Sequence, residues 1–142
     1  MYGSLNEDGS VRGRLVGAYL DNKSFIDRYG REKYVVYGIV EADLSPATKL
    51  SLAIDDLDSK WTGVYNWSSN PAYYTDGTLI DHDVSYSTGQ SWAYRNSAEW
   101  SVMPEIEHSF SNGWKLKSSY RYSKATIDVL NASMGAFVDK AT

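Results

Sequence analysis

The sequence predicts an all-β protein, an antiparallel meander of long hairpins that forms a β-barrel or a segment of one. Apolar and polar residues alternate along five stretches, turn residues separate the stretches, and helical periodicity is almost absent. The 142 residues are enough for one core, so we expect a single barrel-like domain over 1–142.

The first two strand candidates are unusually long. The first covers 11–25 and leads through the charged connection 26–32 to the second, 33–45. In 33–45 the even positions are apolar or small, from Tyr34 to Leu44. Strands of soluble proteins have about five or six residues as a rule, so these lengths already favour a barrel wall.

A hairpin connects the second and third candidates. Ser45-Pro46-Ala47-Thr48 has the composition of a tight turn. In the following stretch, 48–55, Leu50, Leu52 and Ile54 alternate with polar residues. One face of this hairpin is therefore expected to be apolar.

The region 59–97 is irregular and rich in Ser, Asn, Tyr, Trp, Asp and Gly. Pro71 and Asp76-Gly77 are turn signals. Two interpretations stay open: one long loop, or additional short strands around 61–67, 79–86 and 91–94.

A second hairpin is predicted from 98–110 and 114–130. Asn112-Gly113 between them readily adopts the positive φ values of a hairpin turn. The first stretch carries Glu on its polar face and the second carries Lys and Arg, so the two faces should form ion pairs. Pro104 lacks an N–H, which predicts a bulge or a sheet edge at that position.

Composition narrows the classes of function. The formal charge of −4 and a pI near 5.1 give no basic surface for nucleic acid. The absence of Cys excludes disulfides, thiolate nucleophiles and Cys-bound zinc. No stretch of about 18 apolar residues predicts a transmembrane helix, and the start of the chain does not look like a signal peptide.

Clusters with possible chemistry all have a simpler interpretation. Asp81-His82-Asp83 resembles a metal site, but alternation along a strand would separate its ligands, so a solvated loop is favoured. The acidic group at 55–58 lacks the ligand spacing of a calcium loop. His108 has no recognisable nucleophile beside it, and Glu105 with Glu107 fits a salt-bridged face better than a glycosidase pair. We therefore expect no enzyme activity, no catalytic residue, no cofactor and no metal.

An ordered series of segments resembles the barrel of TonB-dependent ferric-siderophore receptors of the outer membrane, of the ferripyoverdine and hydroxamate type. The series covers about 100 residues, and its main segments are Gly13-Arg14-Leu15-Val16-Gly17-Ala18-Tyr19, Arg31-Glu32-Lys33-Tyr34-Val35-Val36-Tyr37-Gly38, Glu41-Ala42-Asp43-Leu44-Ser45-Pro46-Ala47-Thr48-Lys49-Leu50 and Glu107-His108-Ser109-Phe110-Ser111-Asn112-Gly113-Trp114-Lys115-Leu116-Lys117. The alternation agrees, because long connections at 26–32 and 59–97 alternate with short turns at 45–48 and 111–113.

The resemblance implies a role in ferric-siderophore uptake at the bacterial outer membrane. The expected partners are a ferric siderophore, outer-membrane lipid, and either the missing plug domain and barrel strands or further copies of the chain. Five or six strands are too few to close a membrane barrel, which takes about eight, and the plug domain is absent. The chain is therefore not expected to transport alone.

Aromatic residues crowd 59–100, and the resemblance implies that some contact the siderophore. Tyr74, Trp92 and Tyr94 are the candidates for ligand binding. The competing interpretation is that the aromatic group, which also contains Trp61, Tyr65, Trp67, Tyr73 and Trp100, forms a membrane-interface girdle or the core of a soluble barrel.

The alternative function is a small closed β-barrel, designed or natural, that acts as a scaffold or binds a small ligand. The chain has the length of an eight-stranded barrel, and such a barrel would be soluble.

Overall fold

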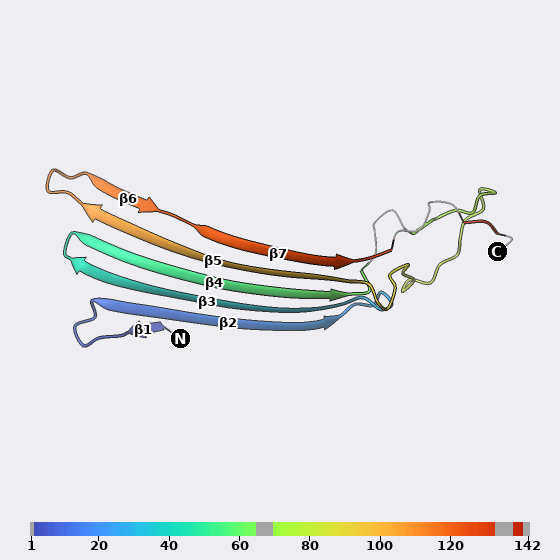
Figure 1. Ribbon diagram of the computed structural model, residues 1–142, viewed down its shortest axis with the longest axis horizontal. Helices are drawn as coiled ribbons and strands as arrows, with labels where there is room; N and C mark the ends of the chain where they lie inside the picture. The colour runs from blue at the N-terminus through green and yellow to red at the C-terminus, as the bar shows by residue number, and fades with distance from the viewer. Residues whose placement is uncertain (1, 65–69, 133–137, 141–142) are drawn as a thin grey trace. The chain divides into compact units, whose positions relative to one another are not determined.

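The computed structural model describes residues 2–64, 70–132 and 138–140. They form an all-β meander with the sheet order β1-β2-β3-β4-β5-β6, and β7 also pairs with β5 (Figure 1). The strands are β1 (Tyr2–Ser4), β2 (Val11–Lys23), β3 (Gly30–Ser45), β4 (Thr48–Thr62), β5 (Tyr94–Ser109), β6 (Lys115–Ser119) and β7 (Tyr122–Leu130). Over these residues the sheet is open, because β1 pairs with neither β6 nor β7. The predicted fold class, a meander of long strands, is confirmed, and the short strand β1 is an addition to it.

The described chain divides into two compact units. The first consists of Met1–Tyr19, Tyr34–Asp58 and Ala98–Thr126, and the second of Leu20–Lys33, Ser59–Ser97 and Ile127–Thr142. The first unit contains the short turns and the second contains the long connections. Across the described ranges, no helix has the length and apolar character needed to cross a membrane.

Both predicted hairpin turns are present in the first unit. β3 ends at Ser45 and β4 begins at Thr48, and the two turns lie side by side because the Ser109 N–H donates to the Ala47 carbonyl at 2.8 Å. In the second turn Gly113 has a φ of +87°. The positive φ expected from Asn-Gly therefore falls on the glycine, which adopts it without a steric penalty.

The ion pairs predicted for the second hairpin also form. Glu107 and Lys117 are opposite each other in the β5–β6 register. The Lys117 ammonium lies 2.8 Å from Glu105 and 2.9 Å from Glu107. One lysine thus separates two neighbouring carboxylates, and the interpretation of Glu105 and Glu107 as a salt-bridged face holds.

Pro104 interrupts the pairing on the strand opposite it, between β6 and β7. β5 lies between β4 and the β6–β7 pair, so it is not an edge strand. The interruption between β6 and β7 falls at 120–121, where the Tyr120 N–H donates to the Pro104 carbonyl at 3.1 Å. Because proline cannot donate in return, the ladder is broken opposite it rather than within β5.

The polarity of the first unit is inverted relative to a soluble sheet. Along β4, Leu50, Leu52 and Ile54 are 41%, 43% and 51% exposed, whereas Ala53 between them is 4% exposed. On β5, Trp100 is exposed and the adjacent Ser101 is buried. Ala53 and Ala93 are the only buried apolar residues of the described chain. These large apolar side chains are therefore exposed, and no large apolar side chain of the described residues is fully buried to form a core.

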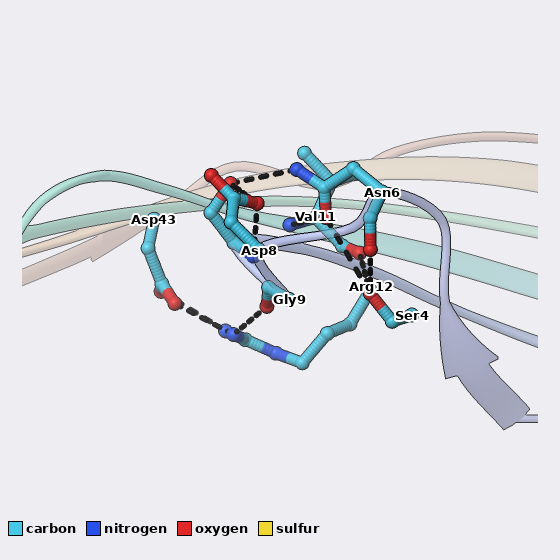
Figure 2. A network of polar contacts seen from close by, with 8 residues as sticks. Ser4, Asn6, Asp8, Gly9, Val11, Arg12 and Asp43 are labelled. Atoms are coloured by element: carbon cyan, nitrogen blue, oxygen red, sulfur yellow. Dashed lines mark hydrogen bonds and ion pairs between the residues drawn. The ribbon is translucent and has the colours of Figure 1, made fainter.

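The polar face of the first unit is organised by ion pairs and hydrogen bonds. Arg12 of β2 bonds to Asp43 of β3 through two contacts, at 2.6 and 2.9 Å, and to the Gly9 carbonyl at 3.0 Å (Figure 2). Farther along the sheet the Ser101 hydroxyl donates to Asp55 at 2.6 Å. These contacts link neighbouring strands, since each partner comes from a different strand or loop.

The structure describes part of 59–97, and residues 65–67 of the strand candidate at 61–67 lie outside the described residues. β4 extends to Thr62 and β5 begins at Tyr94. Over the described part of the connection there is no further strand, only two isolated bridges, Tyr73–Leu79 and Tyr74–Val138. In its described part, the region is therefore a connection between β4 and β5, whose ends extend into it from both sides.

Candidate functional site

The candidate site is a pocket of about 520 Å³ in the second unit. The connection between β2 and β3 forms one part of its wall, and the ends of four strands form the rest. The residues that line it are Asp21, Asn22, Lys23, Ser24, Phe25, Ile26, Asp27, Arg28, Tyr29, Gly30, Arg31, Glu32, Lys60, Trp61, Thr62, Tyr94 and Asn96. A pocket of this volume is within the range for small-molecule sites.

An arginine and two aromatic rings stack beside this pocket. The Arg31 guanidinium carbon lies 4.3 Å from the Trp61 ring centroid. The Tyr29 and Trp61 rings meet edge to face, with centroids 6.0 Å apart and planes at 64°. The site can therefore offer a flat π surface and a cationic group to the same ligand.

The wall formed by the β2–β3 connection is fixed by contacts to the long connection. Arg28 has a φ of +66°, which is uncommon for a residue with a side chain. Its guanidinium donates to the Ser87 carbonyl at 2.6 Å, and the neighbouring Asp27 N–H donates to the Ser85 carbonyl at 2.8 Å. Together these bonds hold the tip of the β2–β3 connection against residues 85–87 of the long connection.

Two glycines allow the backbones to approach at this point. A Cβ on Gly63 would lie 2.2 Å from the Arg28 carbonyl oxygen, and Gly63 has a φ of +63°. A Cβ on Gly89 would lie 2.1 Å from the Gly63 carbonyl oxygen. We call Arg28, Gly63, Ser87 and Gly89 the loop clasp.

The three residues predicted to bind ligand do not all line the pocket. Tyr94 does, and its hydroxyl donates to Asp128 at 3.2 Å. Trp92 is 50% exposed. Tyr74 contacts the C-terminal segment, because it bridges Val138 and lies 5.6 Å below the Lys140 ammonium. Neither Trp92 nor Tyr74 is among the pocket's described lining residues.

The other aromatic candidates are spread over the chain. Trp61 is in the arginine stack, whereas Trp100 belongs to the first unit and lies 5.5 Å from Tyr122 by ring centroids. Tyr65 and Trp67 fall outside the described residues. The sequence interpretation passed over Arg28, Tyr29 and Arg31, although basic and aromatic residues alternating in the connection 26–32 were a visible signal.

The Asp76-Gly77 turn is ordered by its own side chains. The Asp76 carboxylate accepts hydrogen bonds from the Thr78 hydroxyl and from the Thr78 N–H, and it pairs with Lys140 at 3.5 Å. The hydrogen bond from the Thr78 hydroxyl, with that from its N–H, lowers the pKa of Asp76 below the ordinary aspartate value. The carboxylate therefore remains charged at neutral pH and holds the turn.

Metal binding finds no support within the described ranges, where no three possible ligands come together. His82 bonds to the Pro71 carbonyl at 2.9 Å and stacks on Tyr86, with ring centroids 3.9 Å apart. His108 bonds to the Thr48 hydroxyl at 2.8 Å and lies beside Phe110. Both histidines thus have structural contacts.

Long antiparallel strands, short turns in one unit, long connections in the other and an outward apolar face define a segment of a receptor β-barrel. The chain is homologous to a segment of ferripyoverdine receptors. It is 41% identical over 139 residues to the ferripyoverdine receptor of Pseudomonas aeruginosa PAO1, covering 96% of the chain and 16% of the receptor. It is 32% identical to the ferric-pyoverdine BN7/BN8 receptor of Pseudomonas putida, covering 94% of the chain and 16% of that receptor.

Solved structures agree with this homology. The ferripyoverdine receptor of the Pseudomonas aeruginosa outer membrane, bound to ferripyoverdine, matches with a TM-score of 0.92 and 34% identity, over 98% of the chain and 19% of the receptor. The FpvAI–pyocin S2 complex matches with a TM-score of 0.91 and the same 34% identity, over 97% of the chain and 19% of the receptor chain. No family model matches the chain.

These findings confirm the resemblance to TonB-dependent siderophore receptors, which sit in the bacterial outer membrane and are not enzymes. The chain spans about a sixth of the length of the curated relatives that it matches, 16% in both.

Proposed function

We propose that this chain forms part of the barrel wall of an outer-membrane receptor for ferric siderophores and does not transport by itself. The relatives carry ferripyoverdine or ferric pyoverdine in their names, and the chain matches only 16% of their length. The partners are then outer-membrane lipid on the apolar face, a plug domain, and further barrel strands along the open edges.

One observation carries this proposal: the outward apolar face of the first unit. Membrane barrels place apolar residues toward lipid and polar residues toward the interior, alternating along each strand. β4 follows this pattern, since exposed Leu52 and Ile54 flank the buried Ala53 and the polar Ser51 lies on the Ala53 face. A soluble barrel would bury the leucines instead.

The test uses the absence of cysteine, which makes every single-cysteine variant a clean labelling site. Spin labels at 50–55 are compared after the chain is refolded in lipid vesicles. We expect accessibility to oxygen, which concentrates in lipid, to be high at the even positions. Accessibility to a water-soluble nickel chelate should be high at the odd positions.

The reverse pattern, with oxygen accessibility high at the odd positions, would contradict the proposal. So would a folded monomer in plain buffer whose even positions are shielded from the nickel chelate. It would favour the small closed barrel. No observation supports that alternative at present, because the described sheet is open.

We further propose that Tyr74, Trp92 and Tyr94 contact the siderophore. Tyr94 supports this proposal, because it lines the pocket beside the arginine–tryptophan stack. Ferripyoverdine added to the refolded chain should quench tryptophan fluorescence saturably. Trp92→Ala should weaken the response more than Trp114→Ala, a matched change at an exposed turn residue. An equal loss in both variants, or no response from folded protein, would remove these residues as ligand contacts.

A further inference from the structure

A second set of polar groups lies on the face of β3, β4 and β5 that carries Arg31 and Trp61. In two antiparallel strands, every second residue lies on the same face of the sheet. From one pair of neighbours on that face, the next pair is found two residues forward on one strand and two residues back on the other. The contact between Arg31 and Trp61 therefore brings Lys33 beside Ser59. All of these residues belong to the second unit.

The register of β4 and β5 adds two more residues to this face. The Gly63 N–H donates to the Ala93 carbonyl at 2.9 Å. Stepping back from that pair brings Arg95 beside Trp61 and then Ser97 beside Ser59. We call Arg31, Lys33, Ser59, Trp61, Arg95 and Ser97 the Ser59 patch.

Two polar atoms of the patch lack hydrogen-bond partners. Ser59 is only 5% exposed, and its hydroxyl oxygen is shielded from solvent without a partner among the described residues. The Arg31 Nε is likewise shielded and unpartnered. Buried donors without a partner cost free energy and are rare in native proteins, so each calls for a group that can accept its hydrogen.

The positive charge of the patch is also uncompensated. In the described part of the chain, Arg31, Lys33 and Arg95 form no ion pair, whereas Arg12, Lys117, Arg121 and Lys140 each pair with a carboxylate. Glu32 and Asp58, next to the patch in sequence, alternate to the opposite face. A negative ligand would therefore meet three cations, and the carboxylate that follows Ser97 on the same face of β5, Glu99, is paired with Arg121 at 4.0 Å.

We infer that the Ser59 patch binds a compact oxyanion, a carboxylate or a phosphate group. Its oxygens accept hydrogen bonds from the Ser59 hydroxyl and from the Nε side of the Arg31 guanidinium, which presents parallel donors suited to an oxyanion. Lys33 and Arg95 neutralise its charge. Because the two key atoms are shielded, a neighbouring side chain must move to admit the anion. This inference does not rest on the proposed function.

The test titrates the full 142-residue chain, refolded in detergent micelles, with inorganic phosphate and separately with acetate, against sodium chloride at equal ionic strength. Nitrogen-15 NMR reads the Arg31 Nε–H and the Ser59 amide. We expect saturable shifts of both signals and an affinity about tenfold lower in Ser59→Ala and in Arg31→Gln, in line with hydrogen bonds to a charged group. Arg14→Gln, which removes the same charge from an exposed position of the first unit, is the control.

Each outcome decides. A saturable response to phosphate alone assigns the site to phosphate groups, and a response to acetate alone assigns it to carboxylates. The same shift with chloride, an equal loss of affinity in Arg14→Gln, or no shift in the folded wild-type chain overturns the inference. The wild-type titration keeps this test valid even if a variant does not fold.

Discussion

At the scale of single residues, the loop clasp contains the closest backbone approaches found at the described glycines. Gly63 and Gly89 both stand where a Cβ would meet a carbonyl oxygen at close to 2 Å, at 2.2 and 2.1 Å respectively. Arg28, in the same cluster, adopts a positive φ, which is strained for a residue with a side chain. Such strain persists only where the surroundings hold it, and here the Ser87 carbonyl does so.

Gly63→Ala should open the loop clasp. The substitution adds the strain of a positive φ, about 1–2 kcal/mol for a residue with a Cβ, and a clash with backbone that cannot rotate away. We expect faster proteolysis of the 63–93 connection and a lower thermal midpoint, followed by circular dichroism in micelles.

Gly77→Ala separates the two contributions. Gly77 has a φ of +82°, yet nothing lies within 4 Å of its Cβ position, so only the strain applies. If both variants lose the same stability, the close approach at Gly63 contributes nothing.

Residue-level sequence reasoning worked where the cause was local. Asn112-Gly113 specified a positive φ, and the structure has it at Gly113. The loop clasp joins Arg28 to Ser87 across 59 positions of sequence, and no local pattern encodes such a contact. The same reason explains why Trp92 and Tyr74 could not be placed relative to the pocket.

At the scale of elements, contacts on the polar face tie each strand to its neighbour. β1 has three residues and pairs only with the start of β2, at Arg12–Arg14. The Arg12–Asp43 pair joins β2 to β3, and the Asp43 N–H also bonds to the Ser10 carbonyl at 2.8 Å. The N-terminal hairpin is thus joined to β3 by a two-contact ion pair and a backbone hydrogen bond.

Arg12→Ala should loosen this hairpin more than Arg14→Ala does. Two-contact arginine–carboxylate pairs lie at the upper end of the range for exposed ion pairs, so we expect a lower urea midpoint for Arg12→Ala than for Arg14→Ala. Urea unfolding of the chain in micelles measures it, with salt as a second variable because screening should shrink the difference. A difference that persists at high salt would point to lost packing of the arginine stem instead.

Element boundaries were predictable to the extent that alternation fixes them. The four long strands follow patterns visible in the sequence, because period two with one apolar face has no competing structure at that length. The break between β6 and β7 was not located, since it is caused by Pro104 on the neighbouring strand. β1 escaped notice because three residues cannot display a period.

At the scale of the whole molecule, the defining feature is that the described residues expose large apolar side chains and bury only Ala53 and Ala93 among apolar ones. The composition, 42% apolar, is that of an ordinary soluble domain. Alternation predicts two unlike faces but does not say which of them is covered. The exposed leucines and the buried Ala53 and Ser101 supply that missing fact.

In a soluble protein, an arginine is tolerated at an exposed position such as Leu52 and is costly on the covered face, where Ser51 lies. We expect the opposite here: Leu52→Arg should be costly and Ser51→Arg tolerated. On a lipid-facing strand position an arginine costs about 2–4 kcal/mol near the bilayer midplane, whereas Ser51 lies on the polar face and should tolerate it within about 1 kcal/mol. The yield of folded, protease-resistant chain in vesicles reports the difference. Equal yields would mean that Leu52 does not face lipid.

Because the described sheet is open, we expect the assembly of the chain to depend on protein concentration. β1 covers only the start of β2, so over 15–23 that strand has a single described neighbour, β3. An open sheet edge can pair with an extended segment of another chain, and long flat edges template ordered aggregates. We therefore expect dilution during refolding to favour isolated chains, and high protein concentration to favour strand pairing between copies and ordered aggregates.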